Sequence, residues 1–493
     1  MQTWLYVNRR EVARCAVNRM IYEIVMGLEV HIELSTESKL FCSCSAKFGA
    51  EPNENVCPAC SGMPGMPAVV NKKAIELAIA AGLVTNSEIS PVITFDKKNY
   101  FYPDLPTGYQ ITQFFAPICT NGWIRLESGK RITLKQIHIE EDAGKLVHEP
   151  RTRMTLVDFN RASVPLIEIV SNPDFRTAEE VTEYLEKLRL LLSFAGISDC
   201  KMQEGSMRCD INISVREKGD EILGTRTEIK NMNSLKAIAR AIEYEAQRHI
   251  DALETGTEEL VQETRRWDDD ICMTYSMREK EEAADYRYFP NPELMPVFID
   301  EDWVNKILAA LPEPAHEKFA RLTTELGLPE YDSKLISGSQ NLSRIFDGVM
   351  LHFNKAKDVS NWILGELLAI TKELDAGEDD ISVDILKFAT VIKLVDEGKI
   401  NRSVGKKVLF AVIEDGVDPE AYIKEHSLGM VSDTGFLEST IIEVLAENEK
   451  SVVEYRAGSQ KVFGFLVGQV MKKTAGKADP RSVNELLRKL IEG

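Results

Sequence analysis

Hydrophobic and polar positions alternate in short runs between residues 21 and 299, a pattern typical of strands. Residues 28–34 read Leu-Glu-Val-His-Ile-Glu-Leu, and residues 207–215 repeat the same period of two. Helix signals lie between these runs: Asn71 precedes a helix that should reach Gly82, a Thr177–Glu180 capping box precedes one that should stop at Gly196, and Asn233-Ser234 begins a third. These signals predict an α+β domain with mixed sheets.

Strand signals fade after Pro292 and Pro296, and helical runs follow one another. The expected helices lie at about 315–326, 360–374, 384–397, 405–414, 436–447, 460–471 and 482–491, with joints at 375–380 and 415–434. We therefore predict an α+β domain over residues 20–300, an all-α domain over 301–414 and an all-α tail over 415–493. Residues 1–19 hold four arginines and no serine, and we interpret them as a dispensable extension.

Composition and charge narrow the class of protein. The 493 residues are 44% hydrophobic, and no stretch is apolar enough to cross a bilayer. The net charge of −19 argues against nonspecific binding to nucleic acid. Residues 451–493 differ, with eight basic against four acidic side chains. That basic tail is compatible with a local nucleic-acid contact and equally with a solvated helical face.

Four of the nine cysteines lie close together, as Cys42 and Cys44 and then, after twelve residues, Cys57 and Cys60. Two close thiolate pairs suit tetrahedral Zn²⁺, and four protein ligands leave no open position for catalysis. The sequence therefore predicts a structural zinc site, with reduced, unliganded thiols as the alternative. A secreted disulfide protein would be shorter and richer in cysteine, so we expect a cytoplasmic protein.

Acidic and histidine side chains recur at strand spacing. Residues two apart on a strand share a face, which groups Glu29, His31 and Glu33, then His138 and Glu140; Arg208 with Asp210 and Glu228 with Lys230 follow the same rule. Oxygen ligands without thiolates favour Mg²⁺. Taken singly, each set is equally a wetted strand face.

Other nucleotide and amide signatures are missing. The sequence has no GxxxxGK[ST] loop, no GxGxxG turn and no glutaminase-type nucleophile set. Aromatic residues alternate with arginine at 285–290 (Asp-Tyr-Arg-Tyr-Phe-Pro), a pattern that can grip phosphates or stack bases and can also be a packing corner.

Several strings together resemble the B subunit of aspartyl/glutamyl-tRNA amidotransferase. They are MGLEVHIEL at 26–34, YPDLP at 102–106, GYQITQ at 108–113, HIEEDAGK at 138–145, DFNR at 158–161, PLIEIV at 165–170, EGSMRCD at 204–210, EIKN at 228–231 and DYRYF at 285–289. The resemblance extends from Met20 to Gly493. It implies a catalytic cradle, a helical domain and a tail similar to the YqeY family, a similarity that can be extended back to about residue 345.

The resemblance also implies a reaction and partners. A protein of this kind binds misacylated Glu-tRNA(Gln) or Asp-tRNA(Asn), phosphorylates the side-chain carboxylate with ATP and Mg²⁺, and lets ammonia displace the phosphate, as a ligase with glutamine as amide donor. An amidase (A) subunit supplies the ammonia, and the pair is braced by a small C subunit. Carried onto this chain, the Mg²⁺ shell is Glu29, His31, Glu141, Asp210 and Glu228, with Glu140 beside it.

Basic residues follow as further candidates under the resemblance. Lys145, Arg208 and Lys230 are expected to bind phosphate, and Lys472, Lys473, Lys477 and Arg481 to contact tRNA. Two other functions stay open: a zinc-braced, noncatalytic tRNA-binding scaffold, and a carboxylate metallohydrolase acting on phosphate esters. The sequence leaves the preference between the two misacylated tRNAs open.

Overall fold

The computed structural model describes residues 21–149, 151–279, 286–374, 381–429, 434–456, 461–474, 478 and 480–492. The expected extension at 1–19 and the expected joint at 375–380 lie outside these residues. The chain divides into two compact units, with the boundary between Pro314 and Ala315. We describe each unit by itself.

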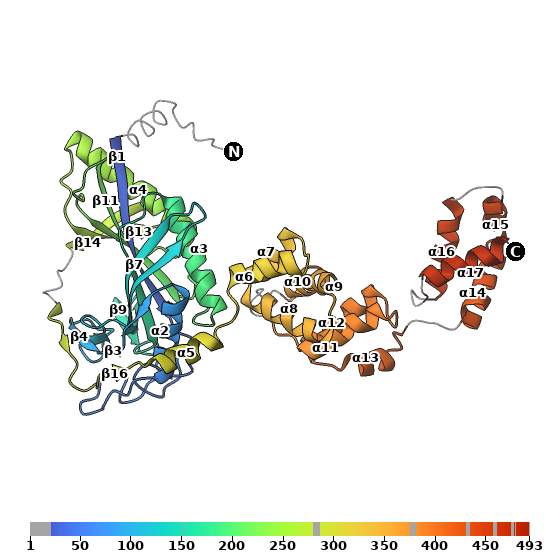
Figure 1. The fold of residues 1–493 in the computed structure, drawn as a ribbon, viewed down its shortest axis with the longest axis horizontal. Helices are drawn as coiled ribbons and strands as arrows, with labels where there is room; N and C mark the ends of the chain where they lie inside the picture. The colour runs from blue at the N-terminus through green and yellow to red at the C-terminus, as the bar shows by residue number, and fades with distance from the viewer. Residues whose placement is uncertain are drawn as a thin grey trace. The chain divides into compact units, whose positions relative to one another are not determined.

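A nine-stranded sheet forms the frame of the first unit (Figure 1). Its strands, in spatial order, are β14 (Met273–Glu279), β13 (Glu263–Asp268), β12 (Thr227–Lys230), β11 (Met207–Glu217), β1 (Tyr22–Glu33), β10 (Pro165–Ser171), β7 (Arg131–Glu141), β6 (Cys119–Arg125) and β2 (Glu88–Ile89). Only β12 and β13 pair in parallel; the other neighbours are antiparallel. The long β1 therefore lies between β10 and β11, which come from distant parts of the sequence.

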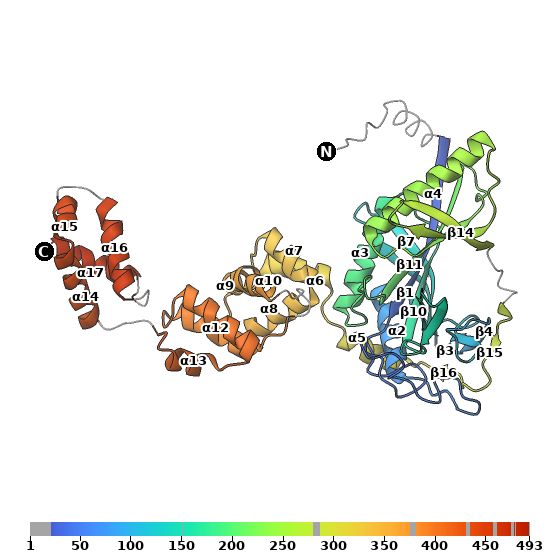
Figure 2. The same cartoon turned by 180° about the vertical axis from the view of Figure 1, so that it is seen from behind.

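Helices cover one face of this sheet (Figures 1 and 2). They are α2 (Lys72–Val84), α3 (Ala178–Phe194) and α4 (Leu235–Thr255), and their apolar sides pack with every second residue of the central strands, including Val30, Ile167 and Ile211. The side chains of Asn71, Thr177 and Ser234 accept hydrogen bonds from the first turns of these helices, as their sequences predicted.

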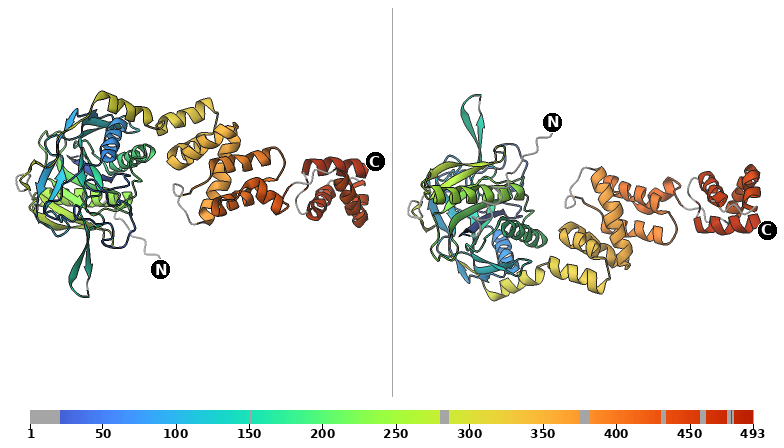
Figure 3. Two further views of the ribbon diagram at one scale, coloured as in Figure 1. Left: turned by 90° about the horizontal axis from the view of Figure 1, so that it is seen from below. Right: turned by 90° about the horizontal axis from the view of Figure 1, so that it is seen from above.

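Three small sheets complete the unit. They are β15 (Phe289–Pro290) with β4 (Asp96–Asn99) and β5 (Tyr109–Thr112); β16 (Val297–Phe298) with β3 (Val92–Ile93); and the hairpin β8 (Lys145–Glu149) with β9 (Met154–Asp158). In Figure 3 the hairpin projects away from the rest of the unit. The helix α5 (Glu301–Ala310) ends the unit, with Trp303, Val304 and Ile307 packed against the core. The sequence placed the domain boundary after residue 300, before this helix.

The described part of the second unit is helical. Its elements are α6 (Ala315–Ala320), the π-helical η2 (Arg321–Glu325), α7 (Glu330–Gly338), α8 (Gln340–His352), α9 (Ala356–Asn361), the π-helical η3 (Trp362–Leu367), α10 (Leu368–Glu373), α11 (Ile385–Asp396), α12 (Arg402–Asp415), α13 (Pro419–Glu425), α14 (Thr434–Glu447), α15 (Glu449–Arg456), α16 (Lys461–Lys473) and α17 (Pro480–Glu492).

Two separate apolar cores hold these helices together, one with members between Leu322 and Val412 and the other between Leu437 and Ile491. The helix α13 lies where the sequence indicated only a joint. None of the described helices combines the length and the hydropathy that a bilayer span requires. The predicted order of an α+β part followed by helical parts is confirmed.

Candidate active site

The face of the large sheet opposite the three helices carries charged side chains from β1, β7, β10, β11 and β12. Cross-strand pairing explains why they meet. Glu29 of β1 lies opposite Asp210 of β11, His31 lies opposite Glu168 of β10, and Asn212 of β11 lies opposite Glu228 of β12. Paired residues of antiparallel strands point to the same face. The alternation seen in the sequence therefore produces one continuous polar surface.

The first group on this surface is Glu29, Asp210 and Glu228, whose carboxylate oxygens lie within 4.8 Å of one another. The ammonium of Lys230 pairs with Asp210 and lies 3.4 Å from Glu228 Oε1. One lysine beside three carboxylates leaves excess negative charge in a half-buried place, which is unfavourable without a further cation. An all-oxygen donor set of this kind fits Mg²⁺.

The second group is His31, Glu140 and Glu168, again with donor atoms within 4.8 Å. His31 Nε2 lies 3.5 Å from Glu140 Oε1 and 3.4 Å from Glu168 Oε2. His138 extends the group, with its Nε2 3.2 Å from Glu168 Oε2. Burial lowers the pKa of His138, but the Glu168 and Glu140 carboxylates outweigh it and raise that pKa to about 10. One histidine with two carboxylates is a donor set that suits Mg²⁺ or Mn²⁺.

The two groups are close because Glu29 and His31 are two residues apart on β1, a separation of about 6.6–7 Å along a strand. The electrostatic influence of Asp210 on His31 reflects the same proximity. The sequence predicted one shell of five ligands. The structure instead divides four of these residues between two groups, and it adds Glu140 and Glu168 to the second.

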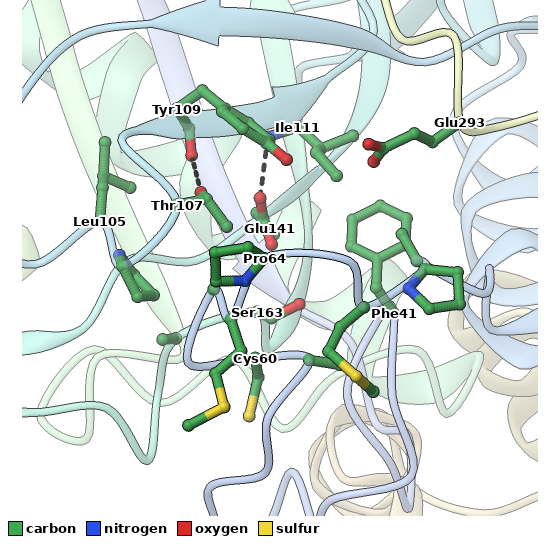
Figure 4. Close-up of a pocket in the computed structure, with 18 of the residues that line it drawn as sticks. Phe41, Cys60, Pro64, Leu105, Thr107, Tyr109, Ile111, Glu141, Ser163 and Glu293 are labelled. Atoms are coloured by element: carbon green, nitrogen blue, oxygen red, sulfur yellow. Dashed lines mark hydrogen bonds between the residues drawn. The ribbon is translucent and has the colours of Figure 1, made fainter.

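Glu141 does not lie with either group. Successive residues of a strand point to opposite faces, so Glu141 points away from Glu140. Its Oε1 accepts a hydrogen bond of 2.9 Å from the backbone N–H of Ile111, and burial raises its pKa to about 7. Glu141 lines a cavity of about 210 Å³ together with Phe41, Cys60, Met63 and Ser163 (Figure 4). The structure therefore places this carboxyl on the cysteine side of the strand.

A third charged cluster lies at the end of the same polar face. Arg208 Nη2 donates to Asp142 Oδ2 at 2.8 Å, and Arg161 Nε lies 3.4 Å from the same oxygen. Burial and the neighbouring Asp142 raise the pKa of Glu33 to about 8. Arg208, which the sequence assigned to phosphate, is thus already paired with a buried carboxylate. Lys230 is likewise paired, whereas Lys145 is exposed at the start of the β8–β9 hairpin.

The four clustered cysteines converge, with sulfur atoms within 4.8 Å of one another. Cys60 Sγ lies 3.8 Å from Cys57 Sγ and 4.0 Å from Cys44 Sγ. Zn–S bonds of about 2.3 Å in a tetrahedron place neighbouring sulfurs about 3.8 Å apart. The ammonium of Lys39, which is fully buried, lies 3.6 Å from Cys60 Sγ and offers a positive charge to the thiolates. This donor set fits Zn²⁺.

The basic residues of the tail are only partly described. Lys472 is exposed in the last turn of α16, and Lys473 beside it pairs with Glu443 at 3.0 Å and with Glu447 at 2.7 Å. Lys477 lies outside the described residues, and Arg481 belongs to the first turn of α17.

Sequence reasoning missed Glu168 as a ligand and passed over the role of His138. A signal for Glu168 was present, since it is the only charged residue in the apolar run at 165–170, but its place beside His31 follows from the strand order, which the sequence does not reveal.

Known proteins place the chain in a family. A model described as the GatB/GatE catalytic domain matches residues 24–305, and one described as the GatB domain matches residues 344–491. The chain is similar to the B subunit of aspartyl/glutamyl-tRNA(Asn/Gln) amidotransferase from Lachnoclostridium phytofermentans, with 53% identity over 96% of this chain and 99% of the relative. The protein of the same name from Caldicellulosiruptor saccharolyticus is 49% identical over 96% of this chain and 100% of the relative. The chain belongs to the GatB family of amidotransferase proteins.

Proposed function

We propose that this chain activates the side-chain carboxylate of Glu-tRNA(Gln), Asp-tRNA(Asn) or both by ATP-dependent phosphorylation, and that ammonia then converts the acyl phosphate to an amide. The chain is an amidotransferase subunit, a ligase that contributes to forming Gln-tRNA(Gln) or Asn-tRNA(Asn). The observation that carries the finer assignment is the pair of three-residue ligand groups side by side on one polar sheet face.

Each step of the reaction can be balanced. A carboxylate oxygen of the aminoacyl group attacks the γ-phosphorus of ATP, and the bond to the β-phosphate oxygen breaks to release ADP. Ammonia then attacks the acyl carbon, inorganic phosphate leaves with the bonding electrons, and the nitrogen loses a proton. A carboxylate is a poor electrophile, so the phosphate is needed as the leaving group.

The chain's own residues would hold the reactants in place. Glu29, Asp210 and Glu228 form one candidate Mg²⁺ site, and His31, Glu140 and Glu168 form the other. Bound there, Mg²⁺ neutralises the charge on the phosphoryl oxygens during transfer. Lys230 and Asn212 orient the first group, because Lys230 pairs with Asp210 and Asn212 Nδ2 donates to Glu29 Oε1 at 2.9 Å.

Partners follow from the same proposal. The ammonia comes from an amidase subunit, and the pair is braced by a small third subunit, because the sequence offers no glutaminase nucleophile of its own. The four cysteines hold a structural Zn²⁺, and the basic surface of the tail contacts tRNA. Glu141 and its cavity lie outside the phosphorylation step, since they are on the other side of β7.

The test is Glu168→Gln in the complete complex with the partner subunits. ADP release on adding misacylated tRNA should fall by about 100-fold or more, because a ligand charge is lost while the shape is kept. Glutamine hydrolysis by the amidase at its basal rate should persist. Glu186→Gln is the matched control, since this exposed residue lies on α3 on the opposite side of the sheet.

Two outcomes would contradict the proposal. ADP release at the normal rate in Glu168→Gln would favour the noncatalytic scaffold. Phosphate-ester hydrolysis that needs neither tRNA nor the partner subunits would favour the metallohydrolase.

A further inference from the structure

A lysine and three tyrosines face the second ligand group from another sheet. Lys98 comes from β4, and Tyr286 and Tyr288 come from the segment around β15, which pairs with β4. This small sheet is fixed against β7 by two hydrogen bonds to Glu141, one from Ile111 N and one of 2.8 Å from Gln110 Nε2 to the Glu141 carbonyl. The position of Lys98 relative to Glu140 is therefore set by ordered backbone.

The surroundings of Lys98 are aromatic and acidic. Its Nζ lies 4.8 Å from the ring centroid of Tyr286 and 5.5 Å from that of Tyr100. Burial lowers the pKa of Lys98, but Glu140, Tyr288, Tyr100 and Glu168 outweigh it and raise the pKa above its usual value. The Tyr288 ring stacks on Phe114 with centroids 4.2 Å apart, so the aromatic wall is itself packed.

Lys98 differs from the other enclosed lysines of this unit in what its ammonium binds. Lys39 donates to Phe159 O, Lys97 lies 3.7 Å from Glu293 Oε2, and Lys230 pairs with Asp210. Within the described part of the chain, the ammonium of Lys98 makes contacts with aromatic rings but no hydrogen bond or ion pair. Its donors are left for something that enters the space between the lysine and the Glu140 and Glu168 carboxylates.

We propose that Lys98 is a further catalytic residue, whose ammonium binds the oxygens of the phosphoryl group during its transfer from ATP. The inference rests on the proposed function. An ammonium and a cation held by His31, Glu140 and Glu168 would repel each other at close range unless an anion lay between them. A phosphoryl group between the two would be held from both sides.

The aromatic wall adds to this effect. Tyr100, Tyr286 and Tyr288 exclude water around the ammonium, and a charge–charge interaction is stronger where water is excluded. The lysine would therefore contribute most as charge spreads over the phosphoryl oxygens in the transition state.

The experiment compares Lys98→Met with Lys98→Arg in the complete complex. At saturating ATP and misacylated tRNA, Lys98→Met should lower the rate of ADP formation by about 100-fold, while the KM for tRNA changes less than about threefold. Lys98→Arg keeps the charge and should recover at least about tenfold of that loss. Lys98→Gln serves as a polar replacement if the methionine variant does not assemble.

Lys97→Met is the matched control. Lys97 is the next residue of β4 and faces the other way, with its Nζ 4.1 Å from the Tyr109 ring centroid. Its loss should lower the melting temperature but leave the rate of ADP formation within about threefold. A second readout is the binding of ADP with aluminium fluoride, which mimics the transferred phosphoryl group; Lys98→Met should weaken it at least tenfold more than it weakens ADP alone.

The failure of this inference can be told apart from failure of the proposed function. If Glu168→Gln abolishes ADP formation while Lys98→Met stays within threefold of the unmodified protein, the role of Lys98 is wrong and the function stands. If neither variant changes ADP formation, the proposed function fails with it.

Discussion

Glu228 depends on a neighbouring hydroxyl for its orientation. Thr264 of β13 lies directly opposite Glu228 of β12 in the parallel pair of strands, and its Oγ1 donates to Glu228 Oε2 at 2.7 Å. Both side chains are buried, with 6% of Glu228 and 3% of Thr264 exposed. Partners that orient a metal ligand commonly matter almost as much as the ligand. We infer that Thr264 positions this carboxylate.

Replacing the hydroxyl with a methyl group tests that role. Thr264→Val keeps the shape but removes the donor, so the Mg²⁺ concentration needed for half-maximal ADP formation should rise by about tenfold or more. Thr264→Ser retains the donor and should behave almost as the unmodified protein. The measurement is ADP formation against Mg²⁺ concentration in the complete complex.

Thr274 provides the control for this test. Its hydroxyl also donates to a buried carboxylate, Glu245 Oε2, at 2.8 Å, but outside the candidate site. Thr274→Val should lower the melting temperature and leave the Mg²⁺ dependence unchanged. An unaltered Mg²⁺ dependence in Thr264→Val would mean that the hydroxyl serves packing only.

Strand parity decided which site residues the sequence could predict. Glu29 with His31, and Asp210 with Arg208, follow from the period of two along single strands, and the structure keeps each pair on one face. The same rule separates Glu140 from its neighbour Glu141, which the family resemblance had placed in the metal shell. Glu168 required the order of β1, β10 and β7, which is a long-range property and leaves no local trace in the sequence.

The loop between the two cysteine pairs holds the β8–β9 hairpin. Asn53 donates from its backbone N–H to Asp158 Oδ1 and from its side chain to Val157 O, each at 3.0 Å. Asn160 Nδ2 in turn donates to the Glu51 carbonyl. A two-stranded hairpin is only marginally stable by itself. We infer that a metal bound by the cysteines orders the hairpin through this loop.

Removing the metal should therefore loosen a defined region. The purified protein should contain about one Zn²⁺ per chain, and Cys57→Ser should lower the zinc content and the melting temperature. Hydrogen exchange should become faster in the cysteine loop and in β9, while the exchange of β1 and β10 stays slow. Metal analysis that finds no zinc in protein purified without chelators would contradict the zinc assignment. Unchanged exchange in β9 would contradict the link to the hairpin.

Local signals predicted helices better than they predicted the sheets. The caps at Asn71, Thr177 and Ser234 identified α2, α3 and α4 because a cap is a short-range hydrogen bond. The parallel pairing of β12 with β13 and the short strands β4, β5 and β15 could not be predicted. Strands of two to four residues carry too little periodicity, and their partners are far away in the sequence.

The chain has three apolar cores, one in the first unit and two in the second. The candidate phosphorylation site lies wholly within the first unit. The last core joins α14, α16 and α17, and its members Val483, Leu487 and Ile491 belong to α17. Deleting only residues 479–493 would therefore expose the core of the tail, so that change cannot isolate the effect of its basic surface. A cut between the second and third cores avoids this fault.

A chain ending after Leu428 should keep the first two cores and lose the tail core. If the basic surface of the tail grips tRNA, the Kd for misacylated tRNA at low salt should rise by about tenfold and the salt dependence of binding should become shallower, because fewer phosphate contacts release counterions. ADP formation at saturating tRNA should stay within about threefold, since the ligand groups are intact.

A double variant examines the same surface with the tail in place. Lys472→Ala with Lys473→Ala removes two positive charges from α16; the pairs of Lys473 with Glu443 and Glu447 are exposed, and such pairs contribute little to stability. This variant should reproduce part of the loss in tRNA affinity without a lower melting temperature. Lys393→Ala, an exposed lysine of α11, controls for net charge. Equal losses in the two cases would assign the effect to overall charge, and unchanged affinity in the truncated chain would return the tail lysines to an ordinary solvated surface.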